Sequence, residues 1–458
     1  MKRLVSHIVN GNGNGRGTLH DEDYTRLKAD LHRSVVEALD LSRIDRWKPE
    51  RLRTEVRAVA NRLASEARVK LPESESERLT SEVMDEVFGL GPLEILFRDP
   101  TVTEVLANGP SKVYVERDGV LEQVPVSFSD NAHLARVIQR IAARVGRRID
   151  ESAPMLDARL PDGSRVNAVF PPLTLDGPVL SIRRFGQILG HEDLLARDSI
   201  APEMLGFLRA VVSSKINVLI SGGGGAGKTT LLNILSSFIP PRERIVTIED
   251  AVELNLPLPH VVRMETRLPN VEGHGQVTQH ELLRNSLRMR PDRIILGEVR
   301  GREAIDMLQA MNTGHEGSLT TIHANDTRDA LSRLEMMVGM SGFDVSVPVL
   351  RGYIGKAITV VVHLSRVSGG ARKVTRISEL LGVNRHGTYR VRDLFRYEQT
   401  GVSDGFAVGS FHATGNVPKL LSRLHAAGQD LPADLFARRE LTHALPVTVL
   451  SEEDSHVR

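Results

Sequence analysis

The stretch Asn217-Val-Leu-Ile-Ser-Gly-Gly-Gly-Gly-Ala-Gly-Lys-Thr-Thr-Leu-Leu-Asn-Ile-Leu235 decides the fold of this chain. Residues 217–220 form a run typical of a buried strand, and the leucine-rich residues after Thr230 favour a helix. Between them, Gly222, Gly227 and Lys228-Thr229 meet the spacing G-x-x-x-x-G-K-[ST]. A strand, a glycine loop and a helix in this order predict a loop that binds phosphate.

The glycines of this loop have a physical reason, because successive backbone N–H groups must wrap a phosphate chain that side chains would obstruct. We expect Lys228 to neutralise the β and γ phosphates and the Thr229 hydroxyl to bind magnesium. A flexible glycine linker would not explain why Lys-Thr opens a helix. The expected ATP-binding residues are Gly222, Gly223, Gly224, Gly225, Ala226, Gly227, Lys228, Thr229 and Thr230.

Acidic residues end two further strands. Arg293-Ile-Ile-Leu-Gly-Glu298 predicts a short apolar strand, and a carboxylate at its carboxyl end would lie beside the phosphate loop. Glu298 is therefore the candidate that orients and polarises the attacking water, with an ordinary surface ion pair as the alternative. Gly297 before it would let substrate approach closely.

The segment Arg244-Ile-Val-Thr-Ile248 predicts the other strand, which leads into three carboxylates within five residues. We assign Glu249 and its neighbours to the magnesium and water shell, since a bound cation would offset their repulsion. Solvated loop acids are the alternative. A third strand, residues 317–322, places His323 at its carboxyl end, where it can donate a hydrogen bond to a γ-phosphate.

Four segments together resemble the type II and type IV secretion ATPases. SGGGGAGKTT (221–230), TIEDAVEL (247–254), RIILGEVRG (293–301) and TGHEGSLTTIHAN (313–325) look like that family's Walker A, Asp box, Walker B and His box. FGLGPLEILFRDPTVTEVLANGPSKVYVERDG (88–119), LPDGSRVNAVFPP (160–172) and SIRRFGQ (181–187) are similar to the CpaF/TadA branch, which powers assembly of tight-adherence (Flp-type) pili. The likeness runs from about Leu71 to Phe436.

The resemblance implies a homo-hexameric ring with ATP, held with Mg²⁺, bound between two domains of each subunit. It implies a cytoplasmic protein at the cytoplasmic face of the inner membrane, which associates with the membrane through platform proteins. Arg165 and Arg183 match family arginines that reach the γ-phosphate. The loop departs from the family's G-x-T-G-S-G-K-T at Gly224 and Ala226, which leaves the turnover rate open.

We expect an α/β fold in which a RecA-like P-loop NTPase domain spans residues 201–395 and follows a smaller mixed α/β domain over 71–187 and a linker over 188–200. Residues 1–70 predict a helical extension, with five more basic than acidic residues through Lys70. A solvated helix face explains this excess, and a docking surface for an acidic partner is the alternative. Residues 396–458 form the expected C-terminal tail.

Composition separates the competing functions. The net charge is +1 from 59 basic and 58 acidic side chains, and 4% of the residues are aromatic, with Trp47 the single tryptophan. These numbers argue against a nucleic-acid translocase of the conjugative type, which needs a basic channel and stacking surfaces. No acceptor-binding motif favours a small-molecule phosphotransferase.

The absence of cysteine fits a reducing compartment. The expected function is an ATPase motor for pilus assembly or protein secretion.

Overall fold

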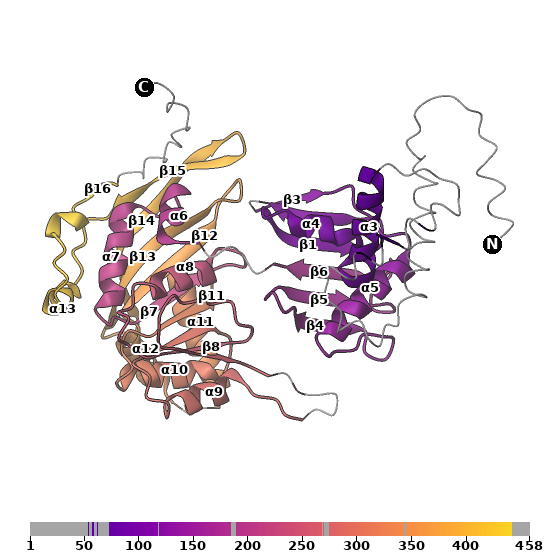
Figure 1. Ribbon diagram of the computed structural model, residues 1–458. Helices are drawn as coiled ribbons and strands as arrows, with labels where there is room; N and C mark the ends of the chain where they lie inside the picture. Colours follow the sequence, from indigo (N-terminus) through magenta and orange to yellow (C-terminus); the bar gives the residue numbers. More distant parts are fainter. Residues whose placement is uncertain are drawn as a thin grey trace, which may run out of the picture. The chain divides into compact units, whose positions relative to one another are not determined.

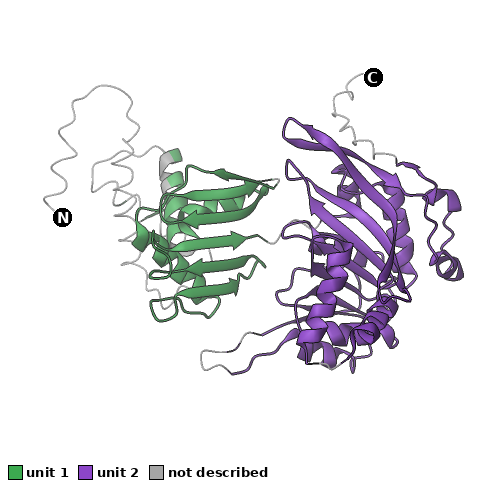
Figure 2. Cartoon of the chain, turned by 180° about the vertical axis from the view of Figure 1, so that it is seen from behind, with its two compact units in different colours: residues 1–185 green, residues 186–458 purple. Residues whose placement is uncertain are grey.

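The computed structural model describes residues 54, 57, 58, 62, 73–117, 119–184, 189–267, 269, 274–342 and 345–441. The chain divides into two compact units, residues 1–185 and residues 186–458 (Figure 2). Of the predicted N-terminal extension only Thr54, Arg57, Ala58 and Arg62 are described, and each is helical. The rest of that prediction, and residues 442–458 of the expected tail, lie outside the described residues.

Unit 1 contains a six-stranded antiparallel sheet in the order β3-β2-β1-β6-β5-β4 (Figure 1). Its strands are β1 Val102–Asn108, β2 Val113–Arg117, β3 Val120–Gln123, β4 Met155–Arg159, β5 Arg165–Val169 and β6 Val179–Arg183. Its helices are α3 Glu73–Phe88, η2 Gly91–Leu93, α4 Glu94–Arg98 and α5 Asn131–Arg144.

One face of this sheet is covered, and helix α5 shows why. Asp130 caps the helix by accepting a hydrogen bond from the His133 backbone N–H at 2.6 Å. Its apolar residues recur at helical spacing and pack with alternate strand residues such as Val105 and Ile182 in one core. The other residues of each strand, at the intervening positions, are polar or half-exposed on the opposite face.

Unit 2 is built on a ten-stranded sheet in the order β16-β15-β14-β13-β12-β7-β11-β10-β8-β9. The six strands from β12 to β9 are parallel and the remaining four are antiparallel. The parallel strands are β7 Val218–Gly222, β8 Ile245–Glu249, β9 Val261–Glu265, β10 Arg293–Val299, β11 Leu319–His323 and β12 Val360–Arg366. The antiparallel strands are β13 Arg372–Val383, β14 Tyr389–Ser403, β15 Phe406–Ala413 and β16 Arg439–Glu440.

Helices cover both faces of the parallel part. Val218 and Ile220 of β7 pack in the core that contains α7 and α8, whereas Leu219 packs in the core that contains α9 to α12. Burial on both faces explains why the strand is continuously apolar. The helices are α6 His191–Ala196, α7 Pro202–Ser213, α8 Lys228–Ser236, α9 Gln279–Ser286, α10 Glu303–Asn312, α11 Thr327–Met340, α12 Val347–Ala357, α13 Leu421–Ala426 and η3 Ala433–Phe436.

Two features differ from the expected organisation of this unit. The boundary expected at residue 395 falls inside β14, because β14 and β15 continue the sheet and the Phe395 and Phe436 rings share a core with Phe207 at centroid distances of 5.6–5.7 Å. The expected linker contains helix α6, whose Asp193 accepts a hydrogen bond from the Gly190 N–H at 2.6 Å.

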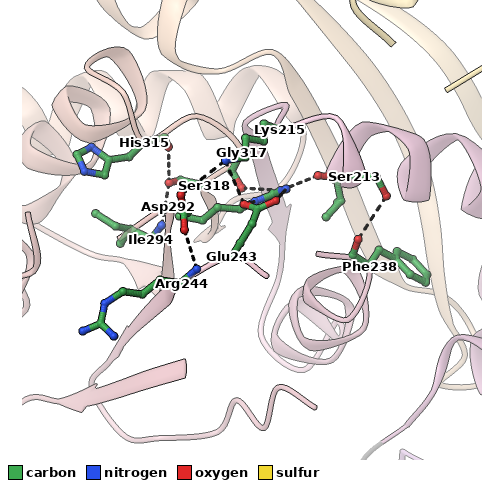
Figure 3. A network of polar contacts seen from close by, with 12 residues as sticks. Ser213, Lys215, Phe238, Glu243, Arg244, Asp292, Ile294, His315, Gly317 and Ser318 are labelled. Atoms are coloured by element: carbon green, nitrogen blue, oxygen red, sulfur yellow. Dashed lines mark hydrogen bonds and ion pairs between the residues drawn. The ribbon is translucent and has the colours of Figure 1, made fainter. Parts of the chain in front are cut away.

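The amino ends of the parallel strands are held by a polar network, which Figure 3 shows around Glu243, Asp292 and Ser318, and its centre is a buried ion pair. Arg293 is fully buried, and its Nε and Nη2 donate to the two Glu243 carboxylate oxygens at 2.7 and 2.9 Å. Its Nη1 donates to the Val212 carbonyl at 2.6 Å. Gly317 closes this cluster, since a Cβ there would lie 2.7 Å from the Lys215 Cα. The network holds the amino ends of these strands in their register. The candidate site described below lies at their opposite, carboxyl ends.

Candidate active site

The carboxyl ends of four parallel strands bring the predicted motifs to one edge of the sheet. Lys228 opens the helix after β7, Glu249 ends β8, Glu298 lies near the end of β10 and His323 ends β11. In α/β sheets ligands bind at this edge, where the strand order reverses. The parallel pairing of these strands therefore assembles residues that lie up to about a hundred positions apart in the sequence.

The phosphate loop has the backbone that its glycines predict. Gly225 and Gly227 adopt positive φ angles of 66° and 97°. A Cβ at Gly222 would lie 2.6 Å from the Leu364 carbonyl oxygen, so the start of the loop admits only glycine. The N-cap of helix α8 is Gly227, which has no side chain to cap the first turn, and a helix N-terminus of this kind favours an anion.

Lys228 and Glu298 meet at the loop. Lys228 Nζ donates hydrogen bonds to the carbonyls of Gly222 and Gly223 at 3.1 and 3.0 Å. The same nitrogen lies 3.9 Å from Glu298 Oε1. The lysine thus bridges the loop backbone and the strand-end acid that sequence analysis assigned to water activation.

Arg300 holds the other side of that acid, and sequence analysis missed it. Its Nη2 lies 2.6 Å from Glu298 Oε2, and its Nη1 lies 3.2 Å from Asp250 Oδ2. Arg300 directly follows β10, two positions after Glu298, and in extended backbone residues two apart project to the same side, so the pattern Glu-Val-Arg carried the signal. The arginine links Glu298 near the end of β10 to Asp250 just after β8.

Glu249 is almost completely buried, with 3% of the residue exposed. Its Oε2 accepts hydrogen bonds from the backbone N–H groups of Glu253 and Leu254 at 2.8 and 3.0 Å, while Oε1 has no partner among the described residues. Burial raises the pKa of this carboxyl to about 7. The side chain therefore shapes the turn after β8, and its assignment to magnesium stays a prediction.

The reason for Gly297 differs from the expected one. A Cβ at this position would lie 3.0 Å from Glu249 Cγ, so the glycine makes room for the buried glutamate. The expectation that it leaves space for substrate was wrong, because the neighbouring strand fills that space. Thr321 Oγ1 donates to the Gly297 carbonyl at 2.7 Å and fixes the strand from its other neighbour.

His323 is exposed at the end of β11 and is in register with Gly222. A Cβ at Gly224 would lie 3.8 Å from His323 Cε1, so the imidazole faces the phosphate loop. The next residue, Ala324, donates its N–H to the Gly222 carbonyl at 3.2 Å. The predicted histidine is thus brought to the loop, where a bound γ-phosphate would be within its reach.

Two more residues contact the loop without belonging to any of the predicted motifs. His363 of β12 is buried, and its Nδ1 lies 2.9 Å from Ser221 Oγ at the start of the loop. Arg372 of β13 donates from Nε to the Gly225 carbonyl at 2.9 Å. Both come from strands more than a hundred residues downstream, and nothing in their local sequence marks them.

Arg165 and Arg183 lie in unit 1 and are brought together there. They are register partners on β5 and β6, so both side chains project from the same face of the sheet. Glu104 on β1 and Arg159 on β4 continue this row to either side. The two arginines therefore stand side by side on the face opposite the unit 1 core.

The residues of the loop fit a nucleotide with magnesium. The positive φ glycines, the N-cap Gly227 without a capping side chain, and Lys228 beside the loop carbonyls and Glu298 form a cradle for a phosphate chain. Thr229 in the first turn supplies a hydroxyl oxygen, and Glu249 keeps one carboxyl oxygen without a partner among the described residues. Hydroxyl and carboxyl oxygens are the donors that Mg²⁺ prefers.

The family model described as type II/IV secretion system protein matches residues 86–403. The chain belongs to this family. A protein of Mycobacterium tuberculosis that carries a conjugal-transfer name is 38% identical to this secretion-system protein over 302 residues, which cover 64% of the chain and 85% of the relative. The type IV secretion system protein VirB11 of Brucella suis is 34% identical over 306 residues, which cover 60% of the chain and 84% of the relative.

Solved structures of similar proteins are ATPases. The crystal structure of the Brucella suis VirB11 ATPase in complex with sulphate shares 32% identity and covers 64% of this secretion-system protein and 97% of its own chain, with a TM-score of 0.35. The Legionella pneumophila ATPase DotB shares 20% identity with a TM-score of 0.45, over 66% of this chain and 82% of its own. Among the described residues, no helix has the length and apolar character to span a membrane.

Proposed function

We propose that this chain is a motor that hydrolyses ATP to ADP and phosphate and so powers pilus assembly of the tight-adherence type or protein secretion across the inner membrane. The observation that carries the proposal is the approach of Lys228 Nζ to Glu298 Oε1, 3.9 Å, beside a glycine loop that leads into the N-terminus of helix α8. Family membership and ATPase relatives support the same activity.

Each residue has a role in this proposal. Lys228 exchanges the carbonyls of Gly222 and Gly223 for the phosphate oxygens. Glu298 accepts a hydrogen bond from the attacking water and orients it, while Arg300 fixes the other oxygen of the same carboxylate. Magnesium, when bound through Thr229 and Glu249, neutralises charge on the phosphates.

His323 and the paired arginines respond to the terminal phosphate. His323 donates a hydrogen bond to it, and loss of the phosphate removes that contact. Arg165 and Arg183 supply positive charge from unit 1, so that hydrolysis changes the attraction between the two units of the ring subunit. We place this cycle in a homo-hexamer that binds platform proteins at the cytoplasmic face of the inner membrane. Repeated attraction and release in its subunits would then move the platform proteins.

Conjugative transfer of nucleic acid is the second candidate. The conjugal-transfer names of several relatives favour it. The net charge of +1 and the aromatic content of 4% favour the assembly motor, because a strand-binding channel needs basic and stacking side chains.

The deciding experiment measures the magnesium-dependent ATPase activity of the full-length protein alone, with single-stranded DNA, and with membranes that contain a pilus platform. We expect stimulation by the membranes and none by DNA. Strong stimulation by DNA would favour the conjugative role. The Lys228→Ala variant is the negative control, because this substitution removes the charge that we expect to hold the phosphates.

Arg183→Ala tests the contribution of unit 1. We expect this variant to bind ATP with unchanged affinity and to turn over at least about tenfold more slowly, because the arginine acts on charge that develops during hydrolysis. Glu440→Ala, which removes an exposed charge at the far edge of unit 2, is a control for nonspecific charge effects. Unchanged turnover in Arg183→Ala would remove the arginine from the mechanism.

A further inference from the structure

Unit 2 has a second concave site, which we call the arginine groove. It is a cavity of about 680 Å³ lined by the start of helix α11, strands β13 and β14, and residues from the segment between β15 and β16. Its lining contains two aspartates, Asp326 and Asp393, and no lysine or glutamate. The arginines that line it are Arg328, Arg376, Arg390, Arg392, Arg396 and Arg438.

The positive charge of the groove is not neutralised by its own acids. Asp326 is used as the N-cap of α11, where it accepts hydrogen bonds from the N–H groups of Arg328 and Asp329 at 2.7 and 2.8 Å. Asp393 accepts from Ser378 Oγ at 2.8 Å and lies 3.3 Å from Arg376 Nη1. Glu398, which lies outside the lining, forms an ion pair with Arg396. Against six arginines these three acids leave an excess of three positive charges at the cavity. Like charges held this close repel one another unless an anion lies between them.

Three groups in the groove are available to such an anion. Within the described part of the chain the guanidinium groups of Arg328 and Arg390 make no hydrogen bond or ion pair. Thr327, with 2% of the residue exposed, lines the cavity, and its Oγ1 has no hydrogen-bond partner among the described residues. A buried hydroxyl without a partner costs free energy that a ligand oxygen would recover.

The groove lies close to the phosphate loop but is separate from it. Ser221, His363, Arg376 and Arg396 are successive register partners on β7, β12, β13 and β14, so their side chains follow one row across the sheet. The buried His363 separates the loop from the first arginine of the groove. None of the loop residues 222–230 lines the cavity.

We infer that the arginine groove binds a small anion that carries two or more phosphate groups, at a site distinct from the ATP site. The volume is typical of sites for small molecules. Planar guanidinium groups bind phosphate oxygens in pairs, and a diphosphate concentrates the negative charge that the three excess arginine charges require. Tyr389 is the one aromatic residue in the lining, which gives no platform for stacked bases. The source of the phosphates is either a free metabolite or a lipid headgroup.

The first test measures the binding of inorganic pyrophosphate to the full-length Lys228→Ala protein by titration calorimetry, so that the phosphate loop does not contribute its lysine. We expect saturable binding that Arg328→Ala or Arg390→Ala weakens about tenfold, as loss of one charge-assisted contact predicts. Both arginines are exposed, and their guanidinium groups make no hydrogen bond or ion pair with another described residue, so we expect the fold to be preserved. Arg385→Ala is the matched control, since it removes an exposed arginine of the β13–β14 turn that does not line the groove.

The inference is overturned if the parent protein does not bind pyrophosphate or if the control weakens binding as much as the groove variants do. Because Lys228→Ala is measured without ATP turnover, either result is independent of the proposed hydrolysis. Co-sedimentation with phosphatidylcholine vesicles containing cardiolipin, and its reversal by pyrophosphate, would assign the source to a lipid headgroup. Pyrophosphate binding without vesicle binding would assign it to a free anion. Binding of a polyglutamate peptide but not pyrophosphate would overturn the phosphate assignment.

Discussion

The two ends of the parallel sheet in unit 2 differ in how completely their buried polar groups are hydrogen-bonded. At the amino ends, the buried Arg293 has both oxygens of Glu243 and a backbone carbonyl as partners. At the carboxyl ends, Glu249 keeps one buried oxygen without a partner among the described residues, and Lys228 is held by backbone carbonyls that a ligand can replace. The comparison teaches that polar groups with all their partners favour stability, and we expect the end that keeps an unpartnered oxygen to serve binding.

The largest expected effect is on catalysis at the carboxyl ends. Glu298→Gln should reduce kcat about a thousandfold and leave nucleotide affinity nearly unchanged, because the amide no longer accepts a proton from water. Steady-state hydrolysis and binding of a fluorescent nucleotide measure the two quantities. The melting temperature should not fall, because we expect the Glu298 carboxylate beside Lys228 to serve catalysis and not stability. Hydrolysis at the wild-type rate would remove Glu298 from this role.

The second effect is on stability at the amino ends. Glu243→Ala should lower the free energy of unfolding by about 3–5 kcal/mol, because it leaves the Arg293 charge buried without its carboxylate. Asp430→Ala is the control, since its ion pair with His425 is exposed and should contribute less than about 1 kcal/mol. Chemical denaturation compares the two variants. Equal losses would show that burial does not distinguish these ion pairs.

The third effect is a pH dependence that begins beside the phosphate loop. Burial lowers the pKa of His363 below its ordinary value of 6.5, so the folded protein keeps the ring neutral. The unfolded chain takes up a proton below about pH 6.5, and the stabilisation is therefore present above that pH and is lost as the pH falls toward the folded pKa. From about pH 7.5 to about pH 5.5, wild type should lose up to about 1.4 kcal/mol more than His363→Gln. If the free energy of unfolding changes between the two pH values by the same amount in wild type and in His363→Gln, this account is contradicted.

The smallest effect is expected at the rim of the phosphate loop. Arg372→Ala should weaken ADP binding by up to about fivefold, because the hydrogen bond from Arg372 to the Gly225 carbonyl steadies a loop rich in glycine. Arg372→Lys keeps the charge and loses the planar geometry, so it should recover only part of the affinity. If both variants bind ADP as wild type does, the loop is already ordered by its own backbone.

The sequence predicted which residues lie at the carboxyl edge of the parallel strands, because the signals for their positions are local, and their catalytic roles stay a prediction. A glycine loop between a strand and a helix, and acids or a histidine at strand ends, place Lys228, Glu298 and His323 at one edge once the strands are parallel. The α/β class and the core strands follow from the same apolar runs. Family membership confirms the secretion class, whereas the CpaF/TadA branch stays a prediction.

Only the tertiary structure decided which distant side chains complete the site. The buried oxygen of Glu249, the room that Gly297 makes for it and the contacts of His363 and Arg372 depend on which strands are neighbours. The same holds for the arginine groove, whose charges come from one helix, two long strands and the segment before β16. Strand order is set by packing between segments far apart in the chain, and no local pattern of residues encodes it.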